Sequence, residues 1–367
     1  MNIPPTQNAV WIDNPGPNGT VQIRTIPTPQ PGDGEVLIKI EYSGICGSDL
    51  RNLHGLGRYT PIPGHEAVGT IIHLGPNISS SSDLLLNRRV GVKWVWDTCG
   101  SCSLCLRGLT NHCPHQLNTG RSVHGTLQEY VLAKPAFVSF VSDALEARLA
   151  APLMCAGHTL VGAVEKMDSF FAAEGSFGSA GAGAGGKTVV VLGAGGGLGH
   201  LGVQLLRQRK YYHVVAIDTG AAKEALCLEL GADHYIDYLA TNPDAPSRVK
   251  NITTDGEGAH AAIIISGAED AFSLAPRLVR NGGVLVVVGL PRNDFCMPVA
   301  PIEISSRGLT IVGASAGTEA QMDELLQMAE RGQVVPTVEV VELEDVAEAF
   351  QRLSDGDVVG RLVVRVS

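Results

Sequence analysis

The sequence is short of positive charge. It contains 27 Lys and Arg residues against 37 Asp and Glu residues, which gives a formal net charge of −10 and a pI near 5.5. A protein that binds DNA or RNA usually presents a basic face to the phosphates, so we expect no nucleic-acid partner. The acidic balance is typical of a solvated surface and does not identify a substrate.

Targeting and membrane-spanning signals are lacking as well. Residues 1–6 contain no basic region followed by an apolar one, so no secretory signal is predicted. The most apolar stretch, residues 149–164, is short for a bilayer span and contains His158. We therefore expect a cytoplasmic protein with no membrane partner. In that reducing compartment, clustered cysteines indicate metal ligands rather than disulfides.

The length of 367 residues and the hydrophobic content of 44% are typical of a soluble enzyme with two domains. Residues 1–165 are predicted to be β-rich and irregular, with a strand at 36–42 behind a segment rich in Pro and Gly. The glycine-rich segment 175–186 is predicted to be a linker or surface loop. No repeat of solenoid type is present.

From residue 188 the pattern changes to continuous apolar strands that alternate with helices. The predicted strands are 188–192, 214–217, 261–265 and 284–288, and the predicted helices are 201–209, 221–230 and 268–279. Such alternation indicates a parallel sheet covered on both faces. Further helices at 318–330 and 343–353 and a last strand at 361–366 complete the chain.

Four cysteines lie within fifteen residues at the spacing C-x2-C-x2-C-x7-C: Cys99, Cys102, Cys105 and Cys113. Four thiolates can close a tetrahedral shell around one zinc ion and leave no position for water. The cluster therefore predicts a structural zinc site that does no chemistry.

A glycine turn, residues 193–199, joins the apolar strand at 188 to the following helix. Glycines allow a close approach to a pyrophosphate, and the helix N-terminus supplies N–H donors. The turn fits G-x-x-G-x-x-G and not the strict G-x-G-x-x-G register. Asp218 ends the next strand, 19 residues after Gly199. A carboxylate there binds a ribose 2′-OH and repels a 2′-phosphate, which favours NAD over NADP.

Cys46, His65 and Cys155 form a second, scattered set of possible zinc ligands. Two thiolates and one imidazole leave one position open for a substrate oxygen. Zinc in such a site polarises a carbonyl group or lowers the pKa of an alcohol. Spacing alone does not establish this set, because single buried cysteines are often inert packing.

Together these segments resemble the zinc-dependent medium-chain alcohol dehydrogenases, and most closely their yeast-type fungal branch. The resemblance spans nearly the whole chain and rests on residues 44–49, 64–66, 99–113, 156–159, 193–199 and 359–361. It implies an α/β protein with a doubly wound Rossmann domain and a β-rich GroES-like catalytic domain. The expected division is 1–165 with 316–367 for the catalytic domain and 166–315 for the NAD domain. It also implies a homotetramer, with a dimer as the alternative.

The resemblance assigns roles around the catalytic zinc. Cys46, His65 and Cys155 are implied to hold the metal, and Glu66 to be a carboxylate that can approach it. Asp49 is implied to bond His65 and to fix its tautomer, as carboxylates behind metal ligands do. Ser48 is implied to bond the substrate oxygen and to start proton transfer.

Cofactor contacts follow in the same way. Thr159 is implied to lie beside the nicotinamide, Lys223 to reach the adenosine ribose and Arg361 to pair with the pyrophosphate. The remaining cofactor positions are those of the turn and the strand that follows: Gly193, Gly196, Gly197, Leu198, Gly199 and Asp218.

Two positions near the first zinc cysteine depart from the family. Gly47 stands where the family commonly has Arg or His against the cofactor phosphates, and Arg51 stands where it commonly has a relay histidine. Arginine stays protonated and cannot pass protons near neutral pH. We expect Arg51 to have moved to phosphate binding, while His54, one helical turn away, is either a substitute relay or an ordinary surface histidine.

The substrate pocket is expected to be wider than in yeast-type enzymes. Leu53 and Gly57 align with two tryptophans that narrow those pockets, and Trp94 keeps the third large wall. The loss of two indoles suggests a substrate larger than ethanol.

The sequence therefore predicts an NAD-linked alcohol dehydrogenase with two zinc ions, which acts on a small-molecule alcohol or carbonyl. One alternative is an NADH-dependent biosynthetic carbonyl, enal or iminium reductase on the same scaffold. An alternative of another class is a non-catalytic protein that senses NAD(H) or redox state.

Overall fold

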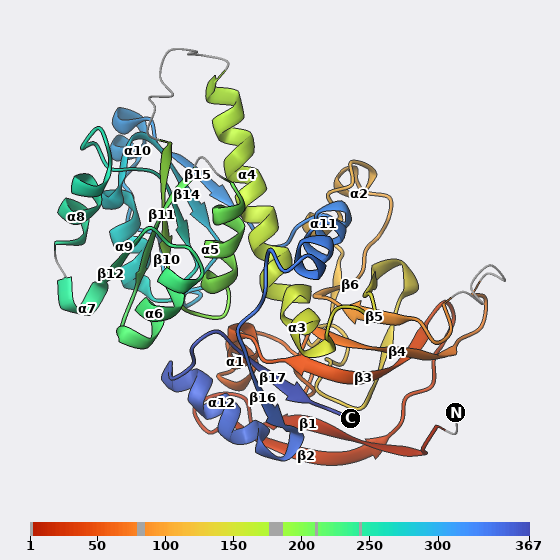
Figure 1. Cartoon of the computed structure of the whole chain (residues 1–367). Coiled ribbons are helices and arrows are strands. Elements are labelled where there is room, and N and C mark those ends of the chain that lie inside the picture. The colour runs from red at the N-terminus through yellow and green to blue at the C-terminus, as the bar shows by residue number, and fades with distance from the viewer. Residues whose placement is uncertain (1–2, 79–84, 176–185, 210–211, 242–243) are drawn as a thin grey trace. The chain divides into compact units, whose positions relative to one another are not determined.

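The computed structural model describes residues 3–78, 85–175, 186–209, 212–241 and 244–367, and the chain divides into two compact units (Figure 1). The first unit combines Met1–His158 with Thr318–Ser367, and the second is Thr159–Gly317. The chain thus passes between the units twice. The predicted domain bounds at 165/166 and 315/316 stay a prediction, and most of the predicted linker 175–186 lies outside the described residues.

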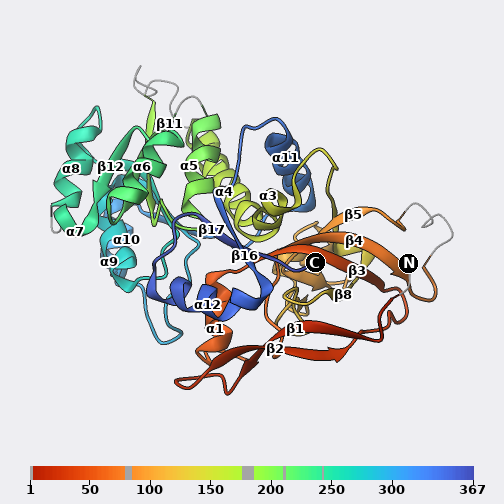
Figure 2. The same ribbon diagram turned by 60° about the horizontal axis from the view of Figure 1, so that its bottom comes forward.

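The first unit is built on a seven-stranded sheet with the strand order β16-β17-β3-β4-β5-β9, in which β8 also pairs with β3. The strands β1 and β2 form an antiparallel hairpin, visible beside this sheet in Figure 2, and β6 pairs with β7. The strands of this unit are β1 (Thr6–Asp13), β2 (Thr20–Pro27), β3 (Val36–Gly44), β4 (Ala67–Leu74), β5 (Arg89–Val92), β6 (Val95–Asp97), β7 (Leu117–Asn118), β8 (Tyr130–Ala133), β9 (Ser139–Phe140), β16 (Val338–Glu342) and β17 (Arg361–Arg365).

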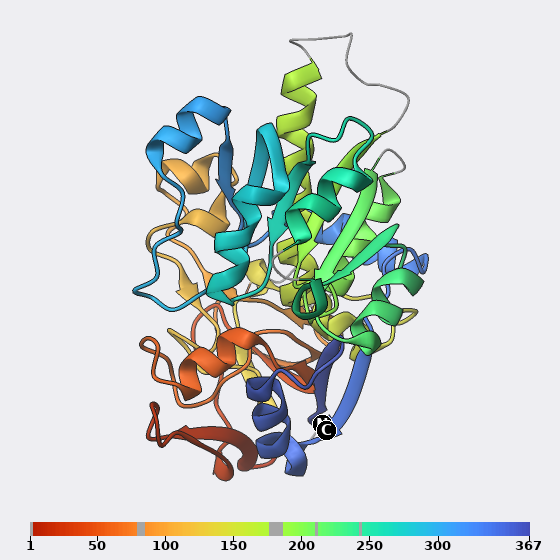
Figure 3. The same cartoon turned by 90° about the vertical axis from the view of Figure 1, so that its left-hand side faces the viewer.

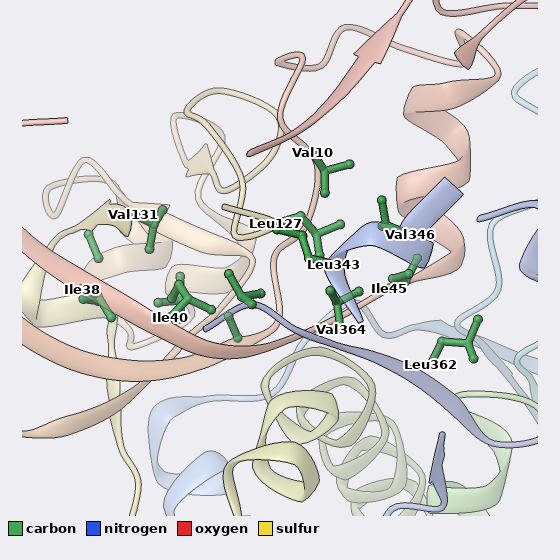
Figure 4. Packing of buried hydrophobic residues seen from close by; sticks show 14 of the residues in the cluster. Val10, Ile38, Ile40, Ile45, Leu127, Val131, Leu343, Val346, Leu362 and Val364 are labelled. Carbon is green, nitrogen blue, oxygen red and sulfur yellow. The ribbon is translucent and has the colours of Figure 1, made fainter. Parts of the chain in front are cut away.

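The core of the first unit draws on both ends of the chain. Ile38 and Ile40 on β3 lie in one buried cluster with Val364 on β17 and Val346 on a C-terminal helix (Figure 4). Because β17 inserts between β16 and β3, the final residues are an interior part of this sheet.

Short helices surround this sheet. They are α1 (Gly47–Leu53), α2 (Ser103–Leu106), η2 (Thr110–His112), η3 (Pro135–Phe137), α3 (Ala147–Pro152), η4 (Leu153–Gly157), α11 (Glu319–Glu330), η5 (Leu343–Asp345) and α12 (Val346–Asp355). The helix α12 buries Ala349 and Phe350 and ends at Gly356, whose φ of +76° favours glycine. The helix α11 begins with a capping box formed by Thr318 and Gln321.

The second unit is a six-stranded parallel sheet with the order β12-β11-β10-β13-β14-β15. Its strands are β10 (Lys187–Leu192), β11 (Tyr212–Asp218), β12 (His234–Asp237), β13 (Ala259–Ile264), β14 (Val279–Val287) and β15 (Thr310–Gly313). Its helices are α4 (His158–Gly175), α5 (Gly199–Gln208), α6 (Ala221–Glu229), α7 (Tyr238–Thr241), α8 (Ala245–Ile252), α9 (Glu269–Leu278) and α10 (Pro301–Arg307).

Helices flank this parallel sheet on both faces (Figure 3). The helices α8 and α9 pack Val249 and Phe272 against Val190, Val215 and other residues of one face of the sheet. The prediction of a parallel sheet covered on both faces is therefore confirmed, and so are the predicted strand and helix positions from 188 to 288 to within a few residues.

One helical run differs from the sequence expectation. The elements α3, η4 and α4 follow one another from Ala147 to Ala173, which is long and apolar enough by length and composition to pass as a membrane span. However, 83% of its most apolar window is buried inside the protein, as in the core helix of a globular domain. The region predicted to be β-rich and irregular up to residue 165 thus ends in helix.

Acidification is expected to weaken the second unit through His260. Its Nδ1 accepts a hydrogen bond of 3.1 Å from the backbone N–H of Thr188 at the start of β10, so the ring must be neutral. Burial, assisted by Arg280 and Lys187, lowers the pKa of His260 to about 4. Since the ordinary value is near 6.5, the unfolded chain binds this proton more readily, and the free energy of unfolding falls as the pH drops from 6.5 to about 4.

The expected loss is about 1–2 kcal/mol after allowance for the partial exposure of the ring. Urea unfolding of the wild type and of His260→Asn at several pH values measures it, because the asparagine oxygen can accept the same hydrogen bond without titrating. An equal pH slope for both proteins would contradict the prediction.

Candidate active site and cofactor turn

The structure brings the three scattered ligands together. Cys46 caps the N-terminus of α1, His65 precedes β4, and Cys155 lies in the π-helical turn η4. Their ligand atoms all lie within 4.8 Å of one another, with 3.9 Å between the two sulfurs and 3.2 Å from His65 Nε2 to Cys155 Sγ. Ligands at zinc–sulfur and zinc–nitrogen bond lengths around a tetrahedral ion are about 3.5–3.8 Å apart, so the arrangement fits one zinc ion.

Asp49 aligns this set. One carboxylate oxygen accepts the backbone N–H of Cys46 and the other accepts that of Gly64, each at 2.9 Å. The second oxygen also lies 3.4 Å from His65 Nδ1. With Nδ1 turned to the carboxylate, Nε2 points toward Cys155, which is the orientation a metal ligand needs. Asp49 thus links two of the three ligands through backbone and side chain.

Two neighbours complete the surroundings of His65. The hydroxyl of Ser48 lies 3.2 Å from Nε2. The indole of Trp94 meets the imidazole edge to face, with 5.2 Å between the ring centres. Ser48 and Trp94 therefore both lie next to the candidate zinc ligand His65, and the roles expected for them stay predictions.

Glu66 is held by Arg361. Two hydrogen bonds, of 3.1 and 2.5 Å, join the guanidinium to the carboxylate, and both side chains are almost fully buried. Glu66 is not among the three residues whose ligand atoms cluster in the described parts of the chain. Burial raises the pKa of Glu66 to about 7 against the opposing effect of Arg361. A side chain at Gly44 would collide with this carboxylate, at 2.2 Å from its Oε1.

The pKa values of the two thiols, Cys46 and Cys155, are shifted in opposite directions. A hydrogen bond from Cys155 lowers the pKa of Cys46 well below its usual value, and Arg361 and His65 act in the same sense. The same hydrogen bond and burial raise the pKa of Cys155. Zinc binding requires both as thiolates and releases the proton.

The four-cysteine cluster has the geometry of a closed zinc shell. The sulfurs are 4.0 Å apart for Cys99 and Cys105, 4.0 Å for Cys102 and Cys113, and 3.5 Å for Cys113 and Cys99. A tetrahedral zinc–thiolate site places its sulfurs about 3.8 Å apart, whereas a disulfide needs about 2.05 Å. All four cysteines are free thiols, and the set fits a structural zinc ion.

The glycine turn joins β10 to α5 as predicted. Gly193 has φ of +87°, and a side chain at Gly199 would lie 2.1 Å from the Gly193 carbonyl oxygen. Both positions therefore require glycine. The other predicted turn positions, Gly196, Gly197 and Leu198, lie between them, and Leu198 caps the N-terminus of α5.

Asp218 closes the turn from the side of β11. Its carboxylate accepts the backbone N–H of Gly195 at 2.8 Å and that of Thr219 at 2.8 Å, and pairs with Lys223 Nζ at 3.1 Å. Sequence reasoning did not single out Gly195. A side chain there would meet the Lys223 side chain at 2.5 Å. The available signal was that Gly195 is the first of three consecutive glycines.

Three further residues for which the sequence predicted a role are Thr159, Arg51 and His54. The Thr159 hydroxyl donates to the Ser315 carbonyl at 2.8 Å within the second unit. Arg51 is half-buried on α1, and the exposed His54 ends that helix, so the segment is helical as the relay alternative required.

The three residues predicted to line the substrate pocket, Leu53, Gly57 and Trp94, differ in burial and in what they contact. Leu53 is half-buried and packs against the core of the first unit. Gly57 is exposed with φ of +155°, and the ring of Tyr59 lies 2.8 Å from where its Cβ would be. Tyr59 therefore fills space that the sequence analysis left open, and only Trp94 of the three touches a candidate zinc ligand.

Comparison with known proteins assigns the family. Residues 32–143 match the model of the alcohol dehydrogenase GroES-like domain, and residues 197–331 match that of the zinc-binding dehydrogenases. An alcohol dehydrogenase of Geobacillus stearothermophilus is 36% identical over 94% of this chain and 96% of its own length. Alcohol dehydrogenase 2 of Emericella nidulans is 32% identical over 100% of this chain and 99% of its own.

Among solved structures, acetophenone reductase from Geotrichum candidum in complex with NAD matches with a TM-score of 0.81 and 25% identity, over 100% of this chain and 98% of that one. The chain belongs to the zinc-dependent medium-chain alcohol dehydrogenases. It is an oxidoreductase that acts on CH–OH groups of small molecules, with zinc and a nicotinamide dinucleotide as cofactors. The predicted fold class is confirmed, while the fungal branch stays a prediction.

Proposed function

We propose that the protein is an NAD-specific alcohol dehydrogenase that carries two zinc ions, one catalytic and one structural. The observation that carries this proposal is the convergence of Cys46, His65 and Cys155, with a hydroxyl at 3.2 Å from the imidazole. The separate four-thiolate cluster supports the second ion.

Zinc, when bound, supplies a Lewis acid that polarises the oxygen of an alcohol or carbonyl, and NAD supplies the hydride acceptor. The chain's own residues orient the metal ligand His65 and move the proton of the substrate. Asp49 holds His65 in the orientation that presents Nε2, and Ser48 takes the proton of the alcohol hydroxyl. The alcohol loses a hydride and a proton and leaves as a carbonyl compound, and the proton passes outward from Ser48 through water or His54.

Arg361 and Glu66 stabilise the site without taking part in that transfer. Removing either partner would leave a buried charge unpaired, and Glu66 directly follows the ligand His65 in sequence. Arg361 is proposed to contact the pyrophosphate and Arg51 to bind phosphate in place of the charge missing at Gly47. Thr159 is proposed to lie beside the nicotinamide.

The cofactor preference is expected to depend on Asp218. Replacing Asp218 with Ser should lower kcat/KM for NAD about 10–100-fold, since a charged hydrogen bond to the ribose is worth about 1.5–3 kcal/mol. The same change should raise activity with NADP, because the repulsion of a 2′-phosphate is gone. Steady-state kinetics with both cofactors measure the switch.

Asp237→Asn is the matched control, because Asp237 ends the neighbouring strand β12 and also accepts a backbone N–H, that of Gly220 at 3.1 Å. An unchanged ratio of NAD to NADP activity in Asp218→Ser would contradict the assignment.

The substrate is proposed to be bulkier than ethanol, because neither Leu53 nor Gly57 places an indole-sized wall and Leu53 packs into the core. The acetophenone reductase likeness supports an aromatic or branched carbonyl partner. Hexanol and benzyl alcohol should therefore give a higher kcat/KM than ethanol in NAD reduction. Much faster turnover of ethanol would show the pocket to be narrow and would assign Tyr59 the part of the missing wall.

A second candidate function is an NADH-dependent reductase of carbonyls, enals or iminium compounds. Arg51 at the relay position favours the iminium substrates among these, because hydride addition to an iminium ion needs no relayed proton and arginine passes none near neutral pH. NADH oxidation with aldehydes, enals and iminium compounds separates the two. The sensing alternative of another class predicts one zinc per chain and no turnover of any panel member.

The protein is proposed to act in the cytoplasm as a homotetramer or homodimer. An exposed edge strand supports self-association: β15 borders the second sheet and carries the half-exposed Ile311. Sedimentation velocity measures the assembly, and a monomer would contradict this part.

A further inference from the structure

His200 is a fully buried imidazole that none of the assigned roles uses. It is the second residue of α5, directly after Gly199 of the cofactor turn, and none of its surface is exposed. A buried polar ring is costly unless its nitrogens are hydrogen-bonded. The atoms that His200 bonds therefore show what keeps a histidine in this core.

One carbonyl oxygen receives two hydrogen bonds from this residue. The Gly196 oxygen lies 3.0 Å from His200 Nδ1 and accepts the backbone N–H of His200 at 3.2 Å. Because a carbonyl only accepts, Nδ1 carries the proton. The Gly196 N–H belongs to the preceding peptide and donates to the Gly193 oxygen at 3.4 Å. Both hydrogen bonds described for the Gly196–Gly197 peptide therefore come from His200.

The hydrogen bonds from His200 act on a segment whose residues have high intrinsic backbone freedom. Residues 195–197 are three consecutive glycines, which have more backbone freedom than any other residues. In a trans peptide the carbonyl and the following N–H point in opposite directions. Fixing the Gly196 oxygen toward α5 therefore turns the Gly197 N–H away from the helix.

We propose that His200 is a positioning residue for the cofactor: its imidazole N–H clamps the Gly196 peptide so that the Gly197 N–H is aimed at the dinucleotide pyrophosphate. The inference rests on the proposed cofactor site. The helix supports the clamp from behind, since the Gln204 side chain donates to the His200 carbonyl at 3.2 Å. A histidine that merely filled the core would have no consequence for phosphate binding.

A pair of variants separates the clamp from simple packing. His200→Leu fills the space without a donor, and His200→Asn retains an N–H that can reach the carbonyl four residues back. The measured quantities are the dissociation constants of NADH, of ADP, which shares the pyrophosphate, and of adenosine, which lacks it. Zinc content and the unfolding temperature are recorded for each variant.

His200→Leu should raise the dissociation constants of NADH and ADP about tenfold, which corresponds to about 1.4 kcal/mol. Adenosine binding should stay within about twofold, and kcat at saturating cofactor should change little. His200→Asn should recover most of the lost ADP affinity. Equal losses in both variants, or an equal loss for adenosine and ADP, would overturn the proposal.

Two further results keep the test decisive. If His200→Leu does not fold, the pair His200→Ala and His200→Ser asks the same question, because serine at this position can also bond the carbonyl four residues back. If the zinc-loaded wild type binds neither NADH nor ADP, the proposed cofactor function fails, and not the clamp alone.

Discussion

Alcohol oxidation should be lost in Cys155→Ala while the protein stays folded, and the zinc content should fall from about two ions per chain to about one. The Cys155 sulfur lies 3.9 Å from that of Cys46 and 3.2 Å from His65 Nε2, so it closes the three-ligand set. With two ligands left, the ion is expected to dissociate, and the Lewis-acid contribution of several kcal/mol disappears with it. We expect kcat/KM to fall at least about 10³-fold.

Metal analysis and steady-state kinetics on one preparation measure this result, with Cys296→Ala as the control. Cys296 is exposed and lies outside both cysteine clusters, so its replacement should leave two zinc ions and full turnover. Retention of both ions by Cys155→Ala, or retained turnover with a single ion, would show that these three residues are not the reactive metal site.

Thermal stability should fall first in Cys102→Ser, with turnover per folded molecule nearly unchanged. Cys102 lies at the N-terminus of α2, and its sulfur accepts the Cys105 N–H at 3.5 Å in addition to approaching Cys113. Structural zinc contributes directly to folding free energy. A loss of about 3–5 kcal/mol would lower Tm by roughly 10 °C or more in a unit of this size.

Calorimetry together with zinc analysis measures this effect, and Ser101→Ala, an exposed neighbour in the same lobe, is the matched control. Cys102→Ser should keep one zinc ion per chain, the catalytic one. Loss of turnover in a folded protein that still holds its other zinc would mean that the lobe takes part in the reaction, contrary to the division of labour proposed between the two clusters.

The second unit was the more predictable half of the fold. The run 188–192 is continuously apolar because β10 is central and buried on both faces, and such runs are visible in sequence. The edge strand β12 was missed, because its four residues begin with the exposed His234 and end with Asp237, a pattern that also suits a loop. The edge strand β15 was missed for a similar reason, since it exposes Ile311.

In the first unit the sequence indicated β structure without its pairing. The helical run from Ala147 carries little polar periodicity because it is buried, so only its apolar character was evident. Strand order could not be derived, since β17 pairs with β3 across more than 300 residues of chain. Pairing of that kind is decided by tertiary packing rather than by local pattern.

The candidate site divides in the same way. The four-cysteine cluster could be predicted from spacing alone, and the scattered ligands only through resemblance. The bonding of Arg361 to Glu66 was not predictable, because 295 residues separate them and the two motifs that contain them do not specify a contact with each other. The ring of Tyr59 over Gly57 depends on a positive φ that the sequence does not specify.

The twofold passage of the chain between its units has a consequence for synthesis on the ribosome. The strand β17 and the guanidinium of Arg361 are made last, yet they complete the sheet and the ion pair next to His65. The contiguous second unit can close while the last fifty residues are still being translated. Until then the half-built first unit exposes an open sheet edge at β3 and an uncompensated Glu66, and this interval is when a nascent chain is most open to misassembly or chaperone capture.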